Sequence, residues 1–202
     1  MQAQSIPAEK VKRIDIGVDT EIFAPDPSAG LRARRVYQIP IEATVVMQTG
    51  KLTPDKSPHW LAHATAPIMR DDPNVWLLFV GSGSSDSLAE ISASMVQYGL
   101  ADRLRIIPPV NLTELKDVYN MADICVYPDA SSLSCMEAAA CARPVIVTDL
   151  PWGKSREEAG ATLCYRRGDI DDLSQKIRWL VSDPDARKAR GQRARDSVLR
   201  SF

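Results

Sequence analysis

One stretch of the chain, residues 122–149, constrains the fold more than any other. It reads ADICVYPDASSLSCMEAAACARPVIVTD, in which two short apolar runs enclose a polar break and a segment of small residues. The apolar runs at 124–127 and 145–147 have the length of buried strands, and the segment between them has the composition of a helix. Three consecutive alanines at 138–140 allow that helix to lie close against a sheet. The stretch therefore predicts a β-α-β unit.

The polar residues of this unit fall where the predicted helix begins. Asp129 and the serines that follow it come directly after the first apolar run. A helix start presents unpaired N–H groups and a positive dipole end, and it receives phosphate well. Ser132, Leu133 and Ser134 are therefore candidate phosphate contacts. Glu137 is the one acidic or basic side chain within this helix, which makes it a candidate ligand contact too.

Strand-like and helix-like segments alternate along most of the chain. Such alternation is typical of an open parallel sheet with helices on both faces, a Rossmann-like α/β fold. Residues 1–30, with Pro25, Pro27 and Gly30, are interpreted as a lead segment and linker packed on a single domain at 31–202. Further predicted strands are 14–18, 43–47, 75–80, 104–107 and 162–165, and predicted helices are 60–69, 86–98, 112–122 (with Tyr119 on its apolar face), 155–159, 170–181 and 184–200.

Three loops are expected at one edge of the sheet, because the carboxyl ends of parallel strands meet there. These loops are 50–56, 81–85 and 128–132. They bring together glycines, lysines and a helix start, a combination that suits a nucleoside diphosphate. The candidate residues are Gly50, Lys51, Lys56, Gly81 and Gly83. Plainer interpretations stay open: the lysines as solvated loop residues, the glycines as common strand ends, Glu137 as a partner of Arg143 or of a neighbouring lysine, and Asp129 as a turn residue or helix N-cap.

Composition excludes several classes of function. A formal net charge of −1 gives no bulk attraction to nucleic acid or to an anionic membrane. No apolar run approaches the ~20 residues of a membrane span, and the polar start lacks a signal-peptide core, so a cytoplasmic location is expected. The four cysteines lack CxxC spacing and are interpreted as core residues. His59 and His63 have helical spacing but no third ligand beside them, so no metal site is expected.

Five blocks of sequence resemble a known family in their order along the chain. They are GVDTEIFAP, TGKLTPDKS, FVGSGS, LTELKDVYNMADICVYP and EAAACARPVIVTD. Together they are similar to the C-terminal, donor-binding half of the retaining glycosyltransferases of family 4 (group 1), which have the GT-B fold. The resemblance covers essentially the whole chain, and five blocks in one order are far more specific than any single block.

The resemblance implies roles for particular residues. Lys51 and Lys56 match the spacing of an Arg and a Lys that hold the diphosphate in the family, with Lys in place of Arg at the first position. Glu137 matches the glutamate on the ribose hydroxyls. Asp129, eight residues earlier, stands where the family has a glutamate near the donor sugar, so both acids become candidate catalytic residues. Val110 falls in the loop that contacts the base.

The function implied is metal-independent transfer of a hexosyl group, with retention, from a nucleotide-diphosphate sugar, without a cofactor. The acceptor, a sugar or lipid, would be held by an N-terminal domain that this chain lacks, and any peripheral membrane association would come through that missing half. The alternative is a non-catalytic nucleotide-binding or interaction module of the same fold. A Rossmann dinucleotide protein is disfavoured because no GxGxxG follows the first strand.

Overall fold

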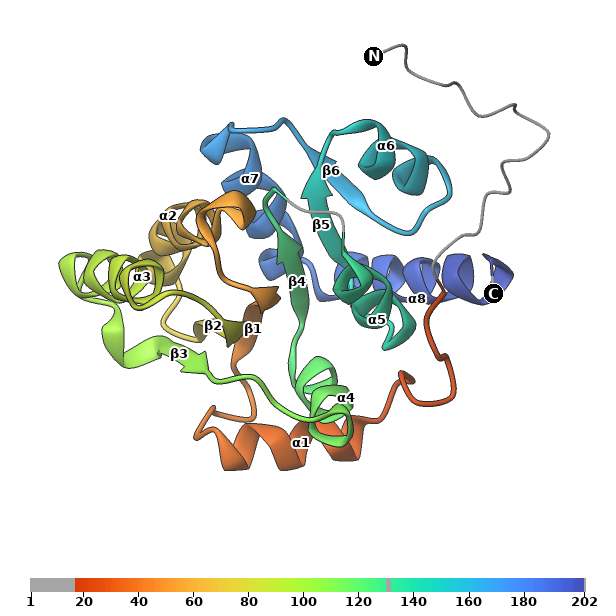
Figure 1. Cartoon of the computed structure of the whole chain (residues 1–202), viewed down its shortest axis with the longest axis horizontal. Helices are drawn as coiled ribbons and strands as arrows, with labels where there is room; N and C mark the ends of the chain where they lie inside the picture. The colour runs from red at the N-terminus through yellow and green to blue at the C-terminus, as the bar shows by residue number, and fades with distance from the viewer. Residues whose placement is uncertain (1–16, 130–131, 202) are drawn as a thin grey trace, which may run out of the picture.

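The computed structural model describes residues 17–129 and 132–201, and within these ranges six parallel strands form one sheet. The strand order is β3-β2-β1-β4-β5-β6 (Figure 1). This order confirms the predicted Rossmann-like α/β fold. The strands are β1 (Thr44–Lys51), β2 (Val75–Ser82), β3 (Leu104–Ile107), β4 (Ile124–Tyr127), β5 (Val145–Thr148) and β6 (Leu163–Tyr165).

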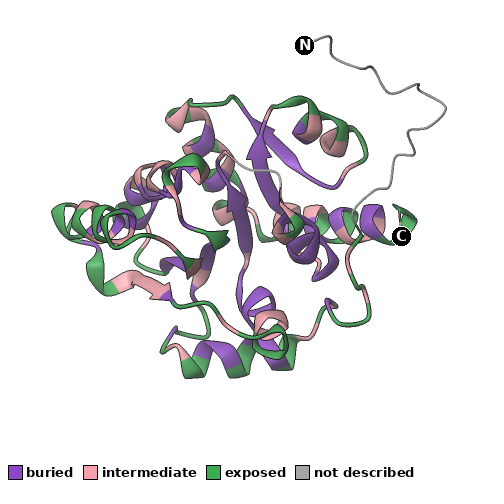
Figure 2. Ribbon diagram, in the orientation of Figure 1, coloured by how far each residue is buried: buried purple, intermediate pink, exposed green. Residues whose placement is uncertain are grey.

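Helices cover both faces of the sheet, and β4, β5 and β6 between them are wholly buried, whereas the edge strand β3 is mostly half-buried (Figure 2). The helices are α1 (Pro27–Val36), α2 (Pro58–Asp71), α3 (Ser85–Gln97), α4 (Leu112–Met121), α5 (Leu133–Ala140), α6 (Pro151–Glu158), α7 (Ile170–Ser182) and α8 (Pro184–Ser201), with short 3-10 turns η2 (Pro54–Lys56) and η3 (Ala101–Arg103). Alternate β1 residues point to opposite sides: Val45 and Met47 join the core under α1, α4, α5 and α8, whereas Val46 joins the core under α2, α3 and α7.

From β1 the chain adds β2 and β3 on one side of the sheet and then crosses over to add β4, β5 and β6 on the other side. The direction in which strands are added therefore reverses between β1 and β4. Strands β1 and β2 pair over eight residues, from Thr44↔Val75 to Lys51↔Ser82. By contrast, β1 and β4 pair through Val46↔Ile124 and Met47↔Cys125 alone. The two strands that flank the reversal are therefore not joined by backbone pairing at their carboxyl ends. In folds of this kind, that gap is where ligands bind.

The predicted linker at residues 25–30 is wrong, because residues 27–30 form the first turn of α1. Asp26 caps the helix by accepting a hydrogen bond from the Ala29 N–H at 3.0 Å, and Pro27 occupies the first turn, where its missing N–H costs nothing. Gly30 allows a close approach to α4, since a Cβ there would lie 2.2 Å from the Asn120 carbonyl oxygen. The expected first strand at 14–18 falls mostly outside the described residues, and Val18 is not in a strand.

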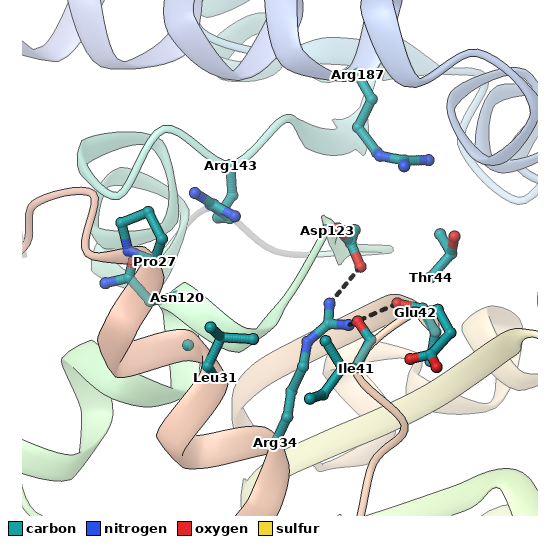
Figure 3. Close-up of a pocket in the computed structure, with 12 residues that line it drawn as sticks. Pro27, Leu31, Arg34, Ile41, Glu42, Thr44, Asn120, Asp123, Arg143 and Arg187 are labelled. Carbon is teal, nitrogen blue, oxygen red and sulfur yellow. Dashed lines mark hydrogen bonds and ion pairs between the residues drawn. The ribbon is translucent and has the colours of Figure 1, made fainter.

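A buried arginine joins α1 to the amino ends of β1 and β4. The Arg34 guanidinium donates to the carbonyl oxygens of Met121 and Ala43, at 3.0 and 2.8 Å. It also forms an ion pair of 2.7 Å with Asp123 (Figure 3). The same Asp123 oxygen accepts the Val45 N–H at 2.8 Å. One side chain thus fixes a helix and two strands that are far apart in the sequence.

We expect Arg34→Ala to lower the free energy of unfolding by about 3–5 kcal/mol, because it leaves a partly buried carboxylate and several carbonyl groups without their donor. Arg35→Ala is the matched control, since Arg35 is exposed and its loss should change stability by less than about 0.5 kcal/mol. Urea unfolding followed by circular dichroism measures both. Equal stabilities of the two variants would contradict this role for Arg34.

Candidate functional site

A cavity of about 270 Å³ opens at the carboxyl edge of the sheet. It lies between the ends of β1 and β2, the loop after β3, helix α4 and the start of α5. Five residues predicted from the sequence line it: Gly50, Lys51, Gly81, Val110 and Ser134. Its other lining residues are Thr49, Val80, Ser82, Pro109, Leu115 and Tyr119. The predicted convergence is confirmed for the loops 50–56 and 81–85, whereas no described residue of the third loop, 128–132, lines the cavity.

Two glycines shape the wall of the cavity. Gly50 and Gly81 have φ angles of +107° and +144°, which side-chain-bearing residues rarely adopt. A Cβ at Gly81 would lie 1.8 Å from the Gly50 carbonyl oxygen, so the ends of β1 and β2 meet closely there. Gly83 serves packing instead. It is not a lining residue, and a Cβ there would lie 2.7 Å from the Leu52 carbonyl oxygen.

Glu137 is buried on α5 immediately behind the cavity wall. Its Oε2 accepts a hydrogen bond of 2.7 Å from the hydroxyl of Tyr119, which does line the cavity. Burial raises the pKa of Glu137, and the bond from Tyr119 offsets part of that rise. Pairing with Arg143, the plainer alternative, does not occur: Arg143 donates to the carbonyl oxygens of Cys141 and Ala122.

Hydroxyl groups continue inward from Tyr119. Its hydroxyl lies 3.0 Å from Thr49 Oγ1, which in turn lies 2.9 Å from the hydroxyl of Tyr127. Tyr127 donates to the Ser134 carbonyl oxygen at 2.9 Å. These bonds bridge the unpaired ends of β1 and β4 and tie both to the first turn of α5. None of the three hydroxyl residues was predicted as part of the site.

The start of α5 lies at the cavity, as expected, but of the three residues predicted there only Ser134 lines it. Ser134 lines the cavity, and a Cβ on Gly50 would lie 3.4 Å from its Oγ. Ser132 is the N-cap, in extended conformation and without a side-chain capping bond. Leu133 is exposed, and neither Ser132 nor Leu133 is a lining residue. The interpretation of Asp129 as N-cap is therefore wrong.

The two predicted lysines are not equivalent. Lys51 ends β1 with its side chain exposed at the cavity. Lys56 lies in η2, outside the cavity lining, with its Nζ 3.3 Å from Asp55. An exposed pair of this kind contributes about 0–1 kcal/mol, so Lys56 can leave Asp55 at little cost. Of the two lysines, Lys51 alone lines the cavity.

Asp129 is engaged by a residue that was not predicted from the sequence. The Arg167 guanidinium donates to both carboxylate oxygens of Asp129, from Nε at 2.8 Å and Nη2 at 3.0 Å. The Arg167 backbone N–H donates to Asp149 at 3.1 Å. Asp129 does not line the cavity, and its side chain is 13% exposed. The basic pair 166–167 directly after β6 was the available signal, since β6 ends at the same sheet edge.

Other features give no competing site. Two cavities of about 360 and 370 Å³ lie at the amino edge of the sheet around Asp123 and Arg143, away from the glycine-lined strand ends. Figure 3 shows the first of them. No cluster of three metal-ligating side chains occurs in the described ranges, and His63 bonds to Tyr98 at 2.7 Å. All four cysteines are buried thiols, as predicted. The helices that the structure describes include none long and apolar enough to cross a bilayer.

Fold and site together define a Rossmann-like α/β domain with a glycine-walled cavity at the carboxyl edge of its sheet, beside the strand reversal. The sequence model of the family described as glycosyl transferases group 1 matches residues 32–197. The chain therefore belongs to the group 1 glycosyltransferase family.

The chain is similar to several proteins named D-inositol 3-phosphate glycosyltransferase. The one from Kineococcus radiotolerans is 35% identical over 92% of this chain and 47% of the relative. The one from Saccharomonospora viridis is 30% identical over 95% of this chain and 47% of the relative. The chain thus spans about half the length of the curated relatives it matches.

Solved structures share the fold. The C-terminal domain of a group 1 glycosyl transferase from Francisella tularensis has a TM-score of 0.81 at 21% identity, covering 91% of this chain and 97% of that domain. HepE of Anabaena in complex with UDP has a TM-score of 0.85 at 20% identity, covering 97% of this chain and 54% of HepE. At these identities, the likeness shows the shared fold alone.

We expect Gly81→Ala to cost more than about 3 kcal/mol of stability, because the added Cβ meets the Gly50 backbone and the φ angle is strained. Gly99→Ala separates these two causes. Gly99 also has a positive φ, +71°, but nothing lies within 4 Å of the place that a Cβ would occupy there, so its cost should be about 1 kcal/mol. Urea unfolding measures both. A loss at Gly81 no larger than at Gly99 would show that the two strand ends can separate.

Proposed function

We propose that this domain is the donor-binding half of a retaining, family 4 glycosyltransferase. It binds a nucleotide-diphosphate sugar in the cavity at the carboxyl edge of the sheet and donates the hexosyl group to an acceptor held by another domain or subunit. The observation that carries the proposal is the placement of a buried carboxyl, Glu137, behind a cavity that also contains glycine strand ends, a lysine and a helix start. Membership of the group 1 family supports it.

Each part of the donor has a matching group in the site. The ribose hydroxyls donate to Glu137, whose Oε2 is bonded to the Tyr119 hydroxyl at the cavity wall. The diphosphate lies along Gly50 and Ser134, where the absence of a side chain and the α5 dipole favour phosphate, and Lys51 adds a positive charge. The base follows Val110. In this arrangement the lysine and helix start neutralise the leaving diphosphate without a metal ion.

The sugar end of the donor points toward Asp129 in this proposal. Asp129 is one methylene shorter than the glutamate it replaces, but Arg167 holds it in a fixed, bidentate geometry. A carboxylate has room for further bonds beyond those two, so Asp129 can still accept a sugar hydroxyl. The guanidinium is 55% exposed and adds donors to the same place. Asp129 and Arg167 thus act together on the sugar.

A second candidate is a nucleotide-binding or interaction module that no longer catalyses. One observation favours it: the acid at the sugar end is occupied by an ion pair. The two candidates differ in whether the sugar contributes to binding. Both predict that the nucleoside diphosphate binds, so titration with UDP, GDP and ADP, with and without an attached sugar, is the first experiment.

We expect Lys51→Ala to weaken binding of the preferred nucleoside diphosphate by about 1.5 kcal/mol, about tenfold, because a charged hydrogen bond to phosphate is lost. The bare nucleoside should bind as before. Lys56→Ala is the matched control and should lose less than half as much, since Lys56 lies outside the cavity lining. Calorimetric titration measures each affinity. Equal losses for diphosphate and nucleoside would rule out the assignment of Lys51 to the phosphates.

We expect Asp129→Asn and Arg167→Ala each to weaken a nucleotide sugar roughly tenfold while changing the plain diphosphate less than about twofold, because both act on the sugar. Arg166→Ala is the control: it removes a neighbouring arginine that pairs with Asp169 instead. The same titrations provide the measurement. If the sugar adds nothing to affinity even in the unmodified protein, the non-catalytic module is the better description.

A further inference from the structure

Four hydrogen bonds run in series from Glu137 to the start of α5. They join Glu137 to Tyr119 (2.7 Å), Tyr119 to Thr49 (3.0 Å), Thr49 to Tyr127 (2.9 Å), and Tyr127 to the Ser134 carbonyl oxygen (2.9 Å). The three hydroxyl residues are buried, with exposures of 0%, 4% and 1% for Tyr119, Thr49 and Tyr127. We call this series the hydroxyl chain.

The number of hydrogens in the hydroxyl chain depends on the charge of Glu137. Each of the three hydroxyls carries one hydrogen, and the Ser134 carbonyl can only accept. A side-chain bond between Ser134 and Tyr119 adds one hydrogen and one contact, so it leaves the difference between the two charge states of Glu137 unchanged. If Glu137 is ionised, three hydrogens serve four contacts. Thr49 can then donate to one tyrosine only, which leaves two oxygens facing each other at about 3 Å without a hydrogen between them. If Glu137 is protonated, four hydrogens serve four contacts, all donated in one direction. The carboxylic acid then donates to Tyr119 across the same 2.7 Å contact, the reverse of the bond that an ionised Glu137 accepts from Tyr119.

The surroundings of Glu137 supply no compensating cation. From α8, Arg195 donates to the Ala140 carbonyl oxygen, and Arg143 donates to carbonyl groups at the end of α5. Lys51 on β1 is exposed at the cavity. The nearby Cys141 thiol has a pKa raised by burial, so it stays neutral. Across the described ranges no ion pair reaches Glu137, and burial raises its pKa, in agreement with the hydrogen count.

We propose that the hydroxyl chain holds Glu137 as a neutral acid in the ligand-free protein, and that binding of the donor ribose ionises it and releases one proton to solvent. The inference rests on the proposed function, because it takes the ribose as the ligand of Glu137. Two ribose hydroxyls then donate to the carboxylate, and Tyr119 turns its hydrogen from Thr49 to Glu137. Thr49, Tyr119 and Tyr127 are thus positioning residues that set the proton state of the site.

The pH dependence follows from this proton release. Donor affinity should rise with pH up to the pKa of Glu137 in the free protein and then level off, because below that pKa a proton must be removed before binding. The limiting slope is one proton, a change of about tenfold in affinity per pH unit. A nucleotide sugar is the proper probe, because its esterified terminal phosphate lacks the second ionisation, near pH 6, that a free diphosphate shows in the same range.

The experiment is calorimetric titration with UDP-, GDP- and ADP-glucose, using whichever binds, from about pH 5 to 8 in pairs of buffers with different ionisation enthalpies. The change of the observed binding enthalpy with the ionisation enthalpy of the buffer gives the number of protons released. We expect release to approach one proton at the acid end and to vanish at the alkaline end. No release at any pH, with binding intact, would overturn the inference.

Two variants test the hydroxyl chain itself. Glu137→Gln should release no proton, since Gln cannot ionise. Thr49→Val should keep the shape of Thr49 but remove its hydroxyl. Two contacts then remain, between Tyr119 and Glu137 and between Tyr127 and the Ser134 carbonyl oxygen. The two tyrosine hydrogens satisfy both of them when Glu137 is ionised. It should therefore bind the nucleotide sugar with less proton release and a flatter pH profile than the unmodified protein. A purely structural role for Thr49 would lower stability without moving the proton count.

A measurement on the free protein separates this inference from the proposed function. Carbon NMR of the glutamate side-chain carboxyls, with Glu137→Gln to assign the resonance, gives the pKa of Glu137 directly. An ordinary value, about 4.3, would overturn the inference even if nucleotide binds normally. A raised value together with no binding of any nucleotide sugar would overturn the proposed function and the release step, while the neutral state of Glu137 would stand.

Discussion

The structure depends on the separation of β1 and β4 at the point where the strand order reverses. Backbone pairing between them ends at Met47↔Cys125, and side chains take over on either side. At the amino ends, Arg34 and Asp123 tie the two strands to α1. At the carboxyl ends, the hydroxyls of Thr49 and Tyr127 span the gap. The crevice is therefore held open at a fixed width by polar bonds on both sides.

Much of the fold and part of the site could be predicted from the sequence, because their signals are local. Apolar runs, glycines at strand ends and a polar helix start lie within a few residues of one another, as at Gly50 and Ser134. The hydroxyl chain could not be predicted in this way. Tyr119 falls on the apolar face of its helix, where a tyrosine looks like any core residue, and its partner Thr49 is 70 residues away. The pairing of Arg167 with Asp129 depends equally on tertiary structure, and Pro27 and Gly30 were misread because both residues also occur in linkers.

The two acids of the site stand in opposite environments. Asp129 is held by a bidentate bond to a guanidinium, whereas Glu137 is buried with a phenol as its partner. The pair is therefore not interchangeable: Asp129 has a cationic partner in place before any ligand arrives, and in our proposal the charge of Glu137 depends on what enters the cavity.

Phe23 extends this arrangement to the segment before α1. It is buried, its ring lies edge-on to Tyr119 with centroids 5.7 Å apart, and its carbonyl oxygen accepts a hydrogen bond of 3.4 Å from Arg195. The chain that enters the domain thus supports the tyrosine on which Glu137 rests. In a hybrid transferase assembled from halves of different enzymes, a junction between Phe23 and α1 would replace that support with foreign sequence. The junction should therefore lie upstream of Asp19, where the turn that carries Phe23 begins.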